Sequence, residues 1–428
     1  MRSAAHAVRP ERMNLEFFIA RRLAAGGSRR ALTVRVAECS VALSLAVMIL
    51  ALAVIMGFKR EITRRLAGFA GHVRITDVRG LGGPSSDPVR CTPELDALVR
   101  ACDGVAAVYP YAVREGIVRT DDAVQGVLLK GVGPDYDWSF FEEFLVAGHL
   151  PRTADSVRTK EVLFSRRAAS ELLLAPGDRA EMLFADPEGG LRRDRFRVSG
   201  IYDTGMEEMD RMLVVGDVRD VRRLAGWGPG EASGCEVTAA GVAAGVAEAG
   251  AVAARIEDAL FRSELEETAN LAAVSIGEEY AHIFDWLRAH DVNAAVVIAV
   301  MLAVAFFNMA AALLVLVFER MRMIGVLRTM GMTGRAVQRL FLWRSSFILL
   351  RGAVWGNLAG VALCLAQRHF HLLKLSSEGY MLSEVPVALE WGWLLALDGG
   401  AAAAIVLLMT LPARVAAAVK PSETIHYE

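Results

Sequence analysis

The chain has 428 residues, enough for two or three domains, and 54% of them are hydrophobic. Its mean hydropathy of +0.36 is hard to reconcile with a wholly soluble protein, so the apolar excess must be concentrated in particular segments. The formal net charge of −2, together with the lack of a Lys/Arg run interleaved with aromatic residues, excludes nucleic acid as a partner.

The first apolar segment, Cys39 to Phe58, contains 20 residues without a charge. Twenty helical residues at about 1.5 Å each cover a hydrocarbon core of about 30 Å. A cleaved signal peptide is the alternative, because Ala51 and Ala53 form an A-x-A pattern. The long preceding tail and the length of the apolar run favour an uncleaved anchor, so we predict a first transmembrane helix over 36–58.

Three further apolar segments predict transmembrane helices over 292–318, 345–367 and 391–412. The first of these is uncharged throughout, whereas Arg351 interrupts the second and Asp398 the third. A charge at membrane depth faces protein or water, so these two side chains either lie near the interface or serve a function. We prefer the interface, because predicted helix ends shift by a few residues.

Basic residues in the short flanking segments give the orientation. Residues 1–35 carry eight Arg against two Glu, and residues 319–344 carry six Arg against one Glu. Residues 368–390 carry two basic and three acidic residues. We therefore predict that 1–35, 319–344 and the tail 413–428 are cytoplasmic, that 368–390 is a periplasmic loop, and that 59–291 is an external domain.

The external segment is typical of a mixed α+β domain. Thr92, with Pro93 at the first helical position, predicts the start of a helix that ends before Gly104. The segments 181–184 and 195–202 predict a hairpin, because a Pro-Glu-Gly-Gly sequence lies between them. Further strands are predicted over 72–76, 116–120, 124–132 and 161–165.

The end of this segment is predicted to be helical. Residues 239–265 are Ala-rich, and 264–291 continue with helix-forming composition into the second span, which predicts a continuous stalk. A separate surface helix is the alternative, because Gly277 lies in the middle. No GxSxG, HExxH or EF-hand pattern occurs, so we predict no catalytic site. Four scattered histidines are interpreted as structural or solvated: His72, His149, His282 and His290.

Five cysteines show no CxxC and no spacing with histidine, so we predict no metal site. Cys91, Cys102 and Cys235 lie in the external segment, and Cys39 and Cys364 lie in predicted spans. A disulfide between Cys91 and Cys102 and a set of three unlinked thiols remain alternatives at this point.

The segment after the second span predicts an amphipathic helix. Met323, Ile324, Leu327 and Met330 form an apolar stripe at helical spacing, flanked by arginines. Such a stripe suits docking on a partner protein, and a basic amphipathic helix is equally suited to an anionic lipid surface.

This segment, ERMRMIGVLRTMG (319–331), resembles the coupling segment of the FtsX-like permease superfamily, which includes the LolC/LolE lipoprotein-releasing permeases and the MacB exporters. NLEFFIARR and VIMGFKREI resemble the opening of the LolC/LolE family, LLKGVGPDYDWSFFEEFLVAGHLP and GIYDTGMEEMD resemble its periplasmic core, and PARVAAAVKPSETIHYE resembles its ending. These segments cover 14–22, 54–62, 128–151, 200–210 and 412–428. Residues 1–13 fall outside the resemblance, which makes Met13 an alternative start.

The resemblance implies an α-helical membrane protein with four transmembrane helices and an α+β periplasmic domain, a MacB-like periplasmic core, inserted between helices 1 and 2. It implies a non-catalytic subunit of the bacterial inner membrane that pairs with a second permease and an ATPase dimer. The chain has no GxxxxGK[ST] motif, so ATP and Mg are expected on the partner ATPase and no cofactor on this chain. The residues that the resemblance places at the ATPase are Glu319, Arg320, Ile324, Gly325, Leu327, Arg328 and Gly331.

The LolC/LolE likeness further implies a substrate class, namely lipid-modified proteins that are released from the membrane to a periplasmic carrier. Acyl chains need an apolar groove, which the family places between helices 1 and 2. Candidate groove residues are Met48, Leu52, Ile55, Met56, Phe306, Phe307 and Met309. The alternative is that these side chains only pack helices or face lipid.

Other functions remain open on sequence alone. A MacB-like efflux or mechanotransmission permease, or an FtsX-type relay to cell-wall hydrolases, would share the coupling segment. The size of the external segment 59–291 argues against the relay, whose external loop is much shorter. Whether the chain has the LolC role, the LolE role or both as a homodimer also stays open.

Overall fold

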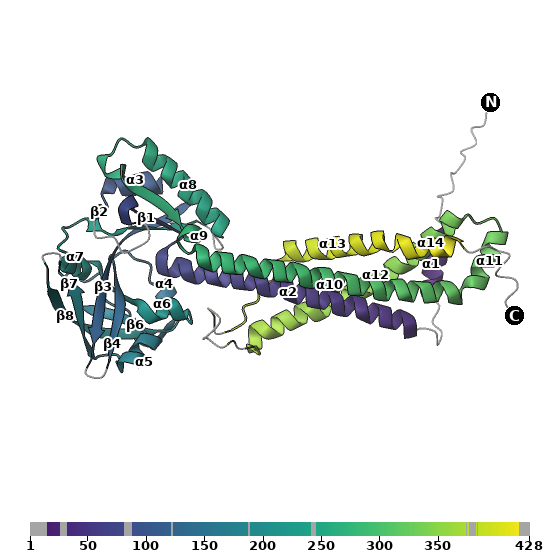
Figure 1. Ribbon diagram of the computed structural model, residues 1–428, viewed down its shortest axis with the longest axis horizontal. Helices are drawn as coiled ribbons and strands as arrows, with labels where there is room; N and C mark the ends of the chain where they lie inside the picture. Colours follow the sequence, from purple (N-terminus) through teal and green to yellow (C-terminus); the bar gives the residue numbers. More distant parts are fainter. Residues whose placement is uncertain are drawn as a thin grey trace, which may run out of the picture. The chain divides into compact units, whose positions relative to one another are not determined.

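The computed structural model describes residues 15–25, 32–80, 88–120, 123–186, 189–240, 245–373, 375, 382 and 384–418. It forms two compact units, whose elements are labelled in Figure 1. The helical unit comprises the chain up to Gly57, residues 289–372 and the chain from Pro386 onward. The α+β unit comprises residues 58–288 and 373–385.

Four helices in the described residues are long and apolar enough to cross a membrane, which confirms the predicted number of spans. They are α2 (Leu32–Ala70), α10 (Ala281–Glu319), α12 (Gly334–Phe370) and α13 (Trp391–Leu408), which α14 (Thr410–Ala418) follows. Helix α12 begins at Gly334, eleven residues before the predicted start at 345. The Thr333 side chain caps this start, because it accepts a hydrogen bond from the Ala336 backbone N–H at 3.3 Å. Its first three turns therefore occupy part of the predicted coupling segment.

Helices α2 and α12 approach each other closely along a row of glycines. Gly352, Gly356 and Gly360 recur every four residues, and a Cβ at Gly356 would lie 2.7 Å from the Ala42 carbonyl oxygen. Such small residues let helix backbones pack without a hydrophobic driving force in lipid. This contact was not predicted, although the G-x-x-x-G-x-x-x-G spacing is its signal.

The helical unit also contains a short helix that the sequence analysis placed in an N-terminal tail. Helix α1 (Leu15–Ala25) packs on α12, where the Phe17 and Trp343 ring centroids are 5.1 Å apart. Glu16 pairs with Arg339 at 3.0 Å, and Ala20 is fully buried. Part of the NLEFFIARR segment is therefore a docked helix.

The α+β unit is built on a sheet of ten strands within the described residues, in the order β12-β1-β11-β3-β4-β9-β6-β8-β5, with β7 paired to β3 and β8. The strands are β1 (Val73–Asp77), β3 (Val105–Arg119), β4 (Val124–Val132), β5 (Leu145–Gly148), β6 (Glu161–Ser165), β7 (Arg179–Ala185), β8 (Leu191–Tyr202), β9 (Leu213–Asp217), β11 (Gly234–Ala239) and β12 (Leu271–Ser275). A small second sheet pairs β2 (Val89–Arg90) with β10 (Glu231–Ala232).

The predicted strands agree well with these bounds. Strands β4 and β6 match 124–132 and 161–165 in full, whereas 116–120 overlaps the end of the longer β3. Strands β7 and β8 form the predicted antiparallel hairpin, with Met182 opposite Asp194. Two residues of its loop, 187–188, lie outside the described residues.

Helices cover the sheet in two groups (Figure 1). The first group, α3 (Pro93–Arg100) and α8 (Val246–Arg262), shares a core with β1 and β11. The second group, α5 (Arg166–Leu172) and α7 (Val218–Ala225), shares a core with β4, β6, β7 and β8. The shorter elements are η1 (Val78–Gly80), α4 (Ser139–Glu143), α6 (Glu207–Met212), η2 (Glu266–Thr268) and α9 (Ile276–Glu279).

The helices predicted in the external segment are only partly correct. Thr92 caps α3 as expected, because its side chain accepts from the Leu95 backbone N–H at 3.3 Å. A helix over 264–291 is wrong, because Leu271–Ser275 forms β12 in register with β1, and α10 begins at Ala281. Sheet pairing to a distant strand overrides the local helical composition there. From Ala281 to Glu319, however, α10 is one unbroken helix.

Candidate functional sites

The predicted coupling residues lie on and around a short helix, α11 (Met321–Thr329), that follows α10 directly. Ile324 is fully buried in the core of the helical unit, and Gly325 is buried as well. Val326 and Met330 are 56% and 79% exposed. The predicted apolar stripe is therefore divided, since Ile324 anchors α11 to the unit while Met330 faces outward.

Gly331 ends α11 for a backbone reason. Its φ is +97°, a conformation that favours glycine, and the Met332 N–H donates to the Leu327 carbonyl oxygen at 3.0 Å. Of the charged coupling residues, Glu319 is exposed at the end of α10, whereas Arg320 and Arg328 are half-buried. The structure brings the seven predicted coupling residues into one region but places only some of them on its surface.

An arginine cluster lies next to this region, at the start of α2 and within α12. Arg351 pairs with Glu38 at 3.5 Å, six residues into α2, and its position at the membrane interface stays a prediction. Arg344 is only 7% exposed, and Arg320, Arg351 and Glu38 are the charges that act on it. The Arg344 Nη1 and Arg320 Nε atoms have no hydrogen-bond partner among the described residues. Arg344 and Arg351 thus share one carboxylate, and Arg320 lies close enough to act on Arg344.

Asp398, the other charge in a predicted span, lies on α13 and interacts with Asn357 of α12. This contact is polar and joins two apolar helices, as expected for a charged group that faces protein rather than lipid.

The predicted groove residues fall into two groups. Met48 and Met309 are fully buried in one apolar cluster, and Phe306 packs against it. Phe307 is 67% exposed. The remaining three, Leu52, Ile55 and Met56, are half-buried on α2. The structure therefore brings together Met48, Phe306 and Met309, and the acyl groove stays a prediction.

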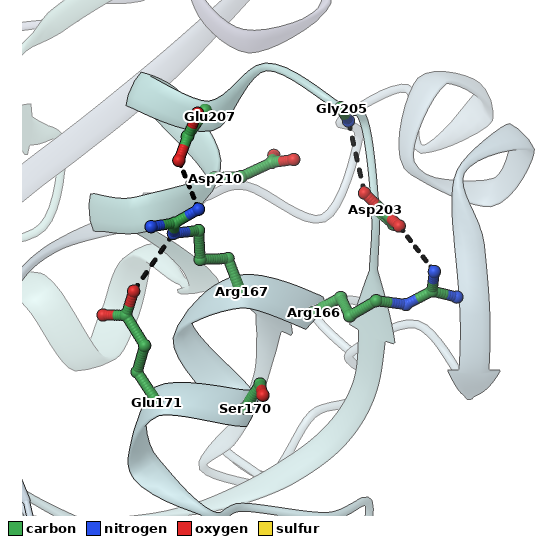
Figure 2. A pocket seen from close by; sticks show the side chains of 8 residues that line it. All are labelled: Arg166, Arg167, Ser170, Glu171, Asp203, Gly205, Glu207 and Asp210. Atoms are coloured by element: carbon green, nitrogen blue, oxygen red, sulfur yellow. Dashed lines mark hydrogen bonds and ion pairs between the residues drawn. The ribbon is translucent and has the colours of Figure 1, made fainter. Parts of the chain in front are cut away.

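The α+β unit has a shallow pocket of about 360 Å³ between α5 and the segment 203–210 (Figure 2). Both of its arginines are paired, because Arg166 lies 2.8 Å from Asp203 and Arg167 lies 3.0 Å from Glu171, and its four acidic residues outnumber them. Arg167 also pairs with Glu207. The segment GIYDTGMEEMD, quoted above for its resemblance, therefore builds one wall of this pocket.

Asp210 is the buried acid of the pocket, at 4% exposed. Burial raises the pKa of its carboxyl group to about 6, although hydrogen bonds from Thr204 oppose this rise. Those bonds come from the Thr204 hydroxyl at 2.6 Å and the Thr204 backbone N–H at 3.2 Å. The Ser165 hydroxyl donates to the Asp210 carbonyl oxygen, so Asp210 links β6 to α6. This arrangement fixes a turn and positions no nucleophile beside a base.

A buried ionic network crosses the centre of the sheet. The Lys130 ammonium on β4 lies 2.7 Å from the Glu236 carboxylate on β11, and both residues are only 2% exposed. Lys130 also donates to the Phe69 carbonyl oxygen near the end of α2. Arg74 lies 3.9 Å from Glu236 and pairs with Glu279 of α9. The network thus ties the last turn of α2 and the segment before α10 to the sheet.

Burial lowers the pKa of Lys130, an effect that the nearby Glu236 opposes, and burial raises the pKa of Glu279. The Tyr136 ring centroid lies 5.5 Å from the Lys130 ammonium, and the Tyr111 ring centroid lies 5.0 Å from the Arg74 guanidinium. This network was not predicted, and its signal in the sequence is a lone lysine inside the apolar run VLLKGV.

All five cysteines are free thiols in the structure, which agrees with the alternative of three unlinked thiols in the external segment. Cys91 lies 2.9 Å from Cys235, sulfur to sulfur, whereas the Cys102 thiol donates to the Leu98 carbonyl oxygen. The alternative of a Cys91–Cys102 disulfide is therefore wrong, because α3 separates these two residues while the pairing of β2 with β10 brings Cys91 next to Cys235. Among the described residues, no group of three or more His, Cys, Asp or Glu is placed to hold a metal ion.

Comparisons with known proteins place this architecture in a family. The family model of the MacB-like periplasmic core domain matches residues 39–259, which is 221 of the 428 residues. The FtsX-like permease C-terminal model matches residues 295–421. The chain therefore belongs to the family of membrane permeases that combine a MacB-like periplasmic core domain with an FtsX-like C-terminal part. Its α+β unit is the periplasmic domain of such a permease.

Full-length relatives confirm the resemblance to the LolC/LolE family. The lipoprotein-releasing system transmembrane protein LolC of Xylella fastidiosa (strain Temecula1) is 24% identical over 91% of this chain and 92% of its own length. LolC of Neisseria meningitidis serogroup B is 22% identical over 92% of this chain and 94% of its own length. LolE of Haemophilus influenzae is 20% identical over 96% of this chain and 99% of its own length.

Two solved structures are also similar to part of the chain. The periplasmic region of MacB from Actinobacillus actinomycetemcomitans has a TM-score of 0.33 at 15% identity, and covers 50% of this chain and 92% of that chain. The extracellular domain of the ABC-type transporter YknZ from Gram-positive bacteria has a TM-score of 0.30 at 14% identity, and covers 47% of this chain and 99% of that chain.

Proposed function

We propose that this permease releases lipid-modified proteins from the bacterial inner membrane to a periplasmic carrier, with ATP and Mg bound by a separate ATPase dimer. The observation that carries the proposal is the match to LolC and LolE proteins over nearly the whole chain. A second permease subunit, either another copy or a related chain, completes the transporter.

The region around α11 is the proposed ATPase contact. Exposed Met330 and Val326 and the neighbouring arginines offer an apolar and basic surface, which suits a partner with an acidic rim. Because buried Ile324 joins α11 to the core of the helical unit, a displacement of α11 by the ATPase would move that core with it. Helix α10 continues without a break from Ala281 to Glu319, where α11 follows.

The acyl chains of the cargo are proposed to bind along α2 and α10. Exposed Phe307 and half-buried Leu52, Ile55 and Met56 are apolar and reachable, whereas Met48 and Met309 become reachable only if the two helices separate. An ATP-driven change in helix packing would thus control access to the groove.

Depletion of the protein tests the proposal in the organism that carries it. We expect lipoproteins to accumulate in the inner membrane, as measured by fractionation and palmitate labelling, and wild-type protein to restore their distribution. An unchanged lipoprotein distribution after depletion would refute the proposed transport.

A variant tests the ATPase contact separately. Charge reversal of Arg320 and Arg328 to Glu is expected to prevent co-purification of the ATPase while the permease still accumulates in the membrane. The matched control is Arg262→Glu, because Arg262 is an exposed arginine of the periplasmic domain. Full transport by the double variant would contradict the coupling assignment.

A further inference from the structure

Two cysteines that lie far apart in the sequence meet in the periplasmic domain. The Cys91 and Cys235 sulfur atoms are 2.9 Å apart, although 144 positions separate the residues. A disulfide bond measures about 2.0 Å, so a small movement of these side chains brings the sulfurs to bonding distance. Cys235 is 4% exposed, whereas Cys91 is half-buried.

Backbone contacts on both sides hold this pair in place. Cys91 follows β2, and its N–H donates to the Gly230 carbonyl oxygen at 2.9 Å. Cys235 belongs to β11, where Ile75 of β1 and Pro110 of β3 lie opposite it. The pairing of β2 with β10, in which Val89 lies opposite Ala232, brings Cys91 next to the start of β11, and Cys91 also precedes the capped start of α3.

We propose that Cys91 and Cys235 form a structural disulfide in the periplasmic domain. The periplasm is an oxidising compartment in which such bonds form and persist. The bond would join the segment before α3 to β11, and the loop that it closes contains every element from α3 to β10. It would thus fasten together the two ends of the chain segment that builds the core around β4, β6, β7 and β8.

The reaction needs an oxidant, which we take to be a periplasmic protein with a reactive dithiol–disulfide centre. Cys91 is the more exposed thiol, so its thiolate attacks the oxidant's disulfide, which forms a mixed disulfide and releases one oxidant thiolate. The Cys235 thiolate then attacks the Cys91 sulfur and releases the second oxidant thiolate. The two cysteines lose two protons and two electrons, and the oxidant's disulfide gains the two electrons.

Thiol trapping of the full-length chain tests this pairing. Cells are treated with N-ethylmaleimide before lysis, and the protein is digested without reductant and analysed by mass spectrometry. We expect a cross-linked peptide that contains Cys91 and Cys235, with Cys102 alkylated. Three alkylated cysteines, or a cross-link that includes Cys102, would overturn the proposal.

Thermal denaturation of the same full-length protein in detergent gives an independent readout. Because the bond closes a long loop, we expect a reductant to lower the melting temperature of the domain by about 5–10 °C. Cys102→Ser is the matched control and should keep this sensitivity to reductant, whereas Cys235→Ser should lose it. A melting temperature of the wild-type protein that does not respond to reductant would also contradict the proposal. Neither readout depends on lipoprotein transport.

Discussion

The buried pair Lys130–Glu236 makes the sharpest prediction about the stability of the periplasmic domain. Lys130→Met keeps most of the apolar stem of the side chain but removes the ammonium. Glu236 would then remain 2% exposed without the partner that now lies 2.7 Å away, and the Phe69 carbonyl oxygen would lose its donor.

The expected cost follows from the burial of both groups. Removing one partner of a buried ion pair destabilises a protein by about 3–5 kcal/mol, because the remaining desolvated charge loses its partner. Arg74 stays 3.9 Å from Glu236 and offsets part of this loss, so the lower end of the range applies. For a domain of this size, about 1 kcal/mol shifts the melting temperature by about 2–4 °C. We therefore expect Lys130→Met to lower it by about 10 °C.

The assay is thermal denaturation of the full-length chain in detergent, followed by tryptophan fluorescence. The control is Arg262→Met, which breaks the Arg262–Asp258 pair, whose side chains are 74% and 54% exposed. An exposed pair of this kind contributes about 0–1 kcal/mol. The double variant Lys130→Met/Glu236→Gln should regain much of the lost melting temperature, because neither position of the former pair then carries a buried charge. If Lys130→Met melts no lower than the control, the reasoning is wrong.

Three further outcomes are expected. Burial raises the pKa of Asp210 to about 6 in the folded domain. Between about pH 4 and pH 6 the folded state therefore binds more protons than the unfolded chain. The free energy of unfolding should thus fall as pH rises through this window. In Asp210→Asn, the change in the free energy of unfolding across this pH window should be smaller by about 3 kcal/mol, as measured by denaturant titration at several pH values. An unchanged pH profile would contradict the raised pKa of Asp210. Gly356→Leu should push α2 and α12 apart, because its Cβ would lie 2.7 Å from the Ala42 carbonyl oxygen, and should reduce the yield of folded protein in detergent, as measured by size-exclusion chromatography. Gly399→Leu, whose Cβ meets nothing within 4 Å, is its control, and equal yields would refute the packing argument. A photo-cross-linker at exposed Phe307 should capture acylated cargo, whereas one at exposed Phe261 of α8 should not, and equal capture at both positions would count against the groove.

Much of the architecture was predictable because it depends on local or one-dimensional properties. Long uncharged runs such as 292–318 must be spanning helices whatever else the protein contains, since lipid satisfies no backbone polar group. Strand β4 follows from β-rich composition, and α3 follows from Thr92 and Pro93, because alternation and capping act within a few residues. The coupling segment and the family were predictable in the same way, because they depend on contiguous motifs.

The tertiary structure decided whatever depends on contacts between distant residues. Leu271–Ser275 has helix-forming neighbours but becomes a strand, because β1 offers it a partner about 200 residues earlier in the chain. Ile324 is in register with the apolar stripe of α11, yet only the packed core of the helical unit determines that it faces inward. In the same way Cys91 lies close to Cys102 along the chain but meets Cys235, since a sheet brings together residues that sequence distance cannot relate.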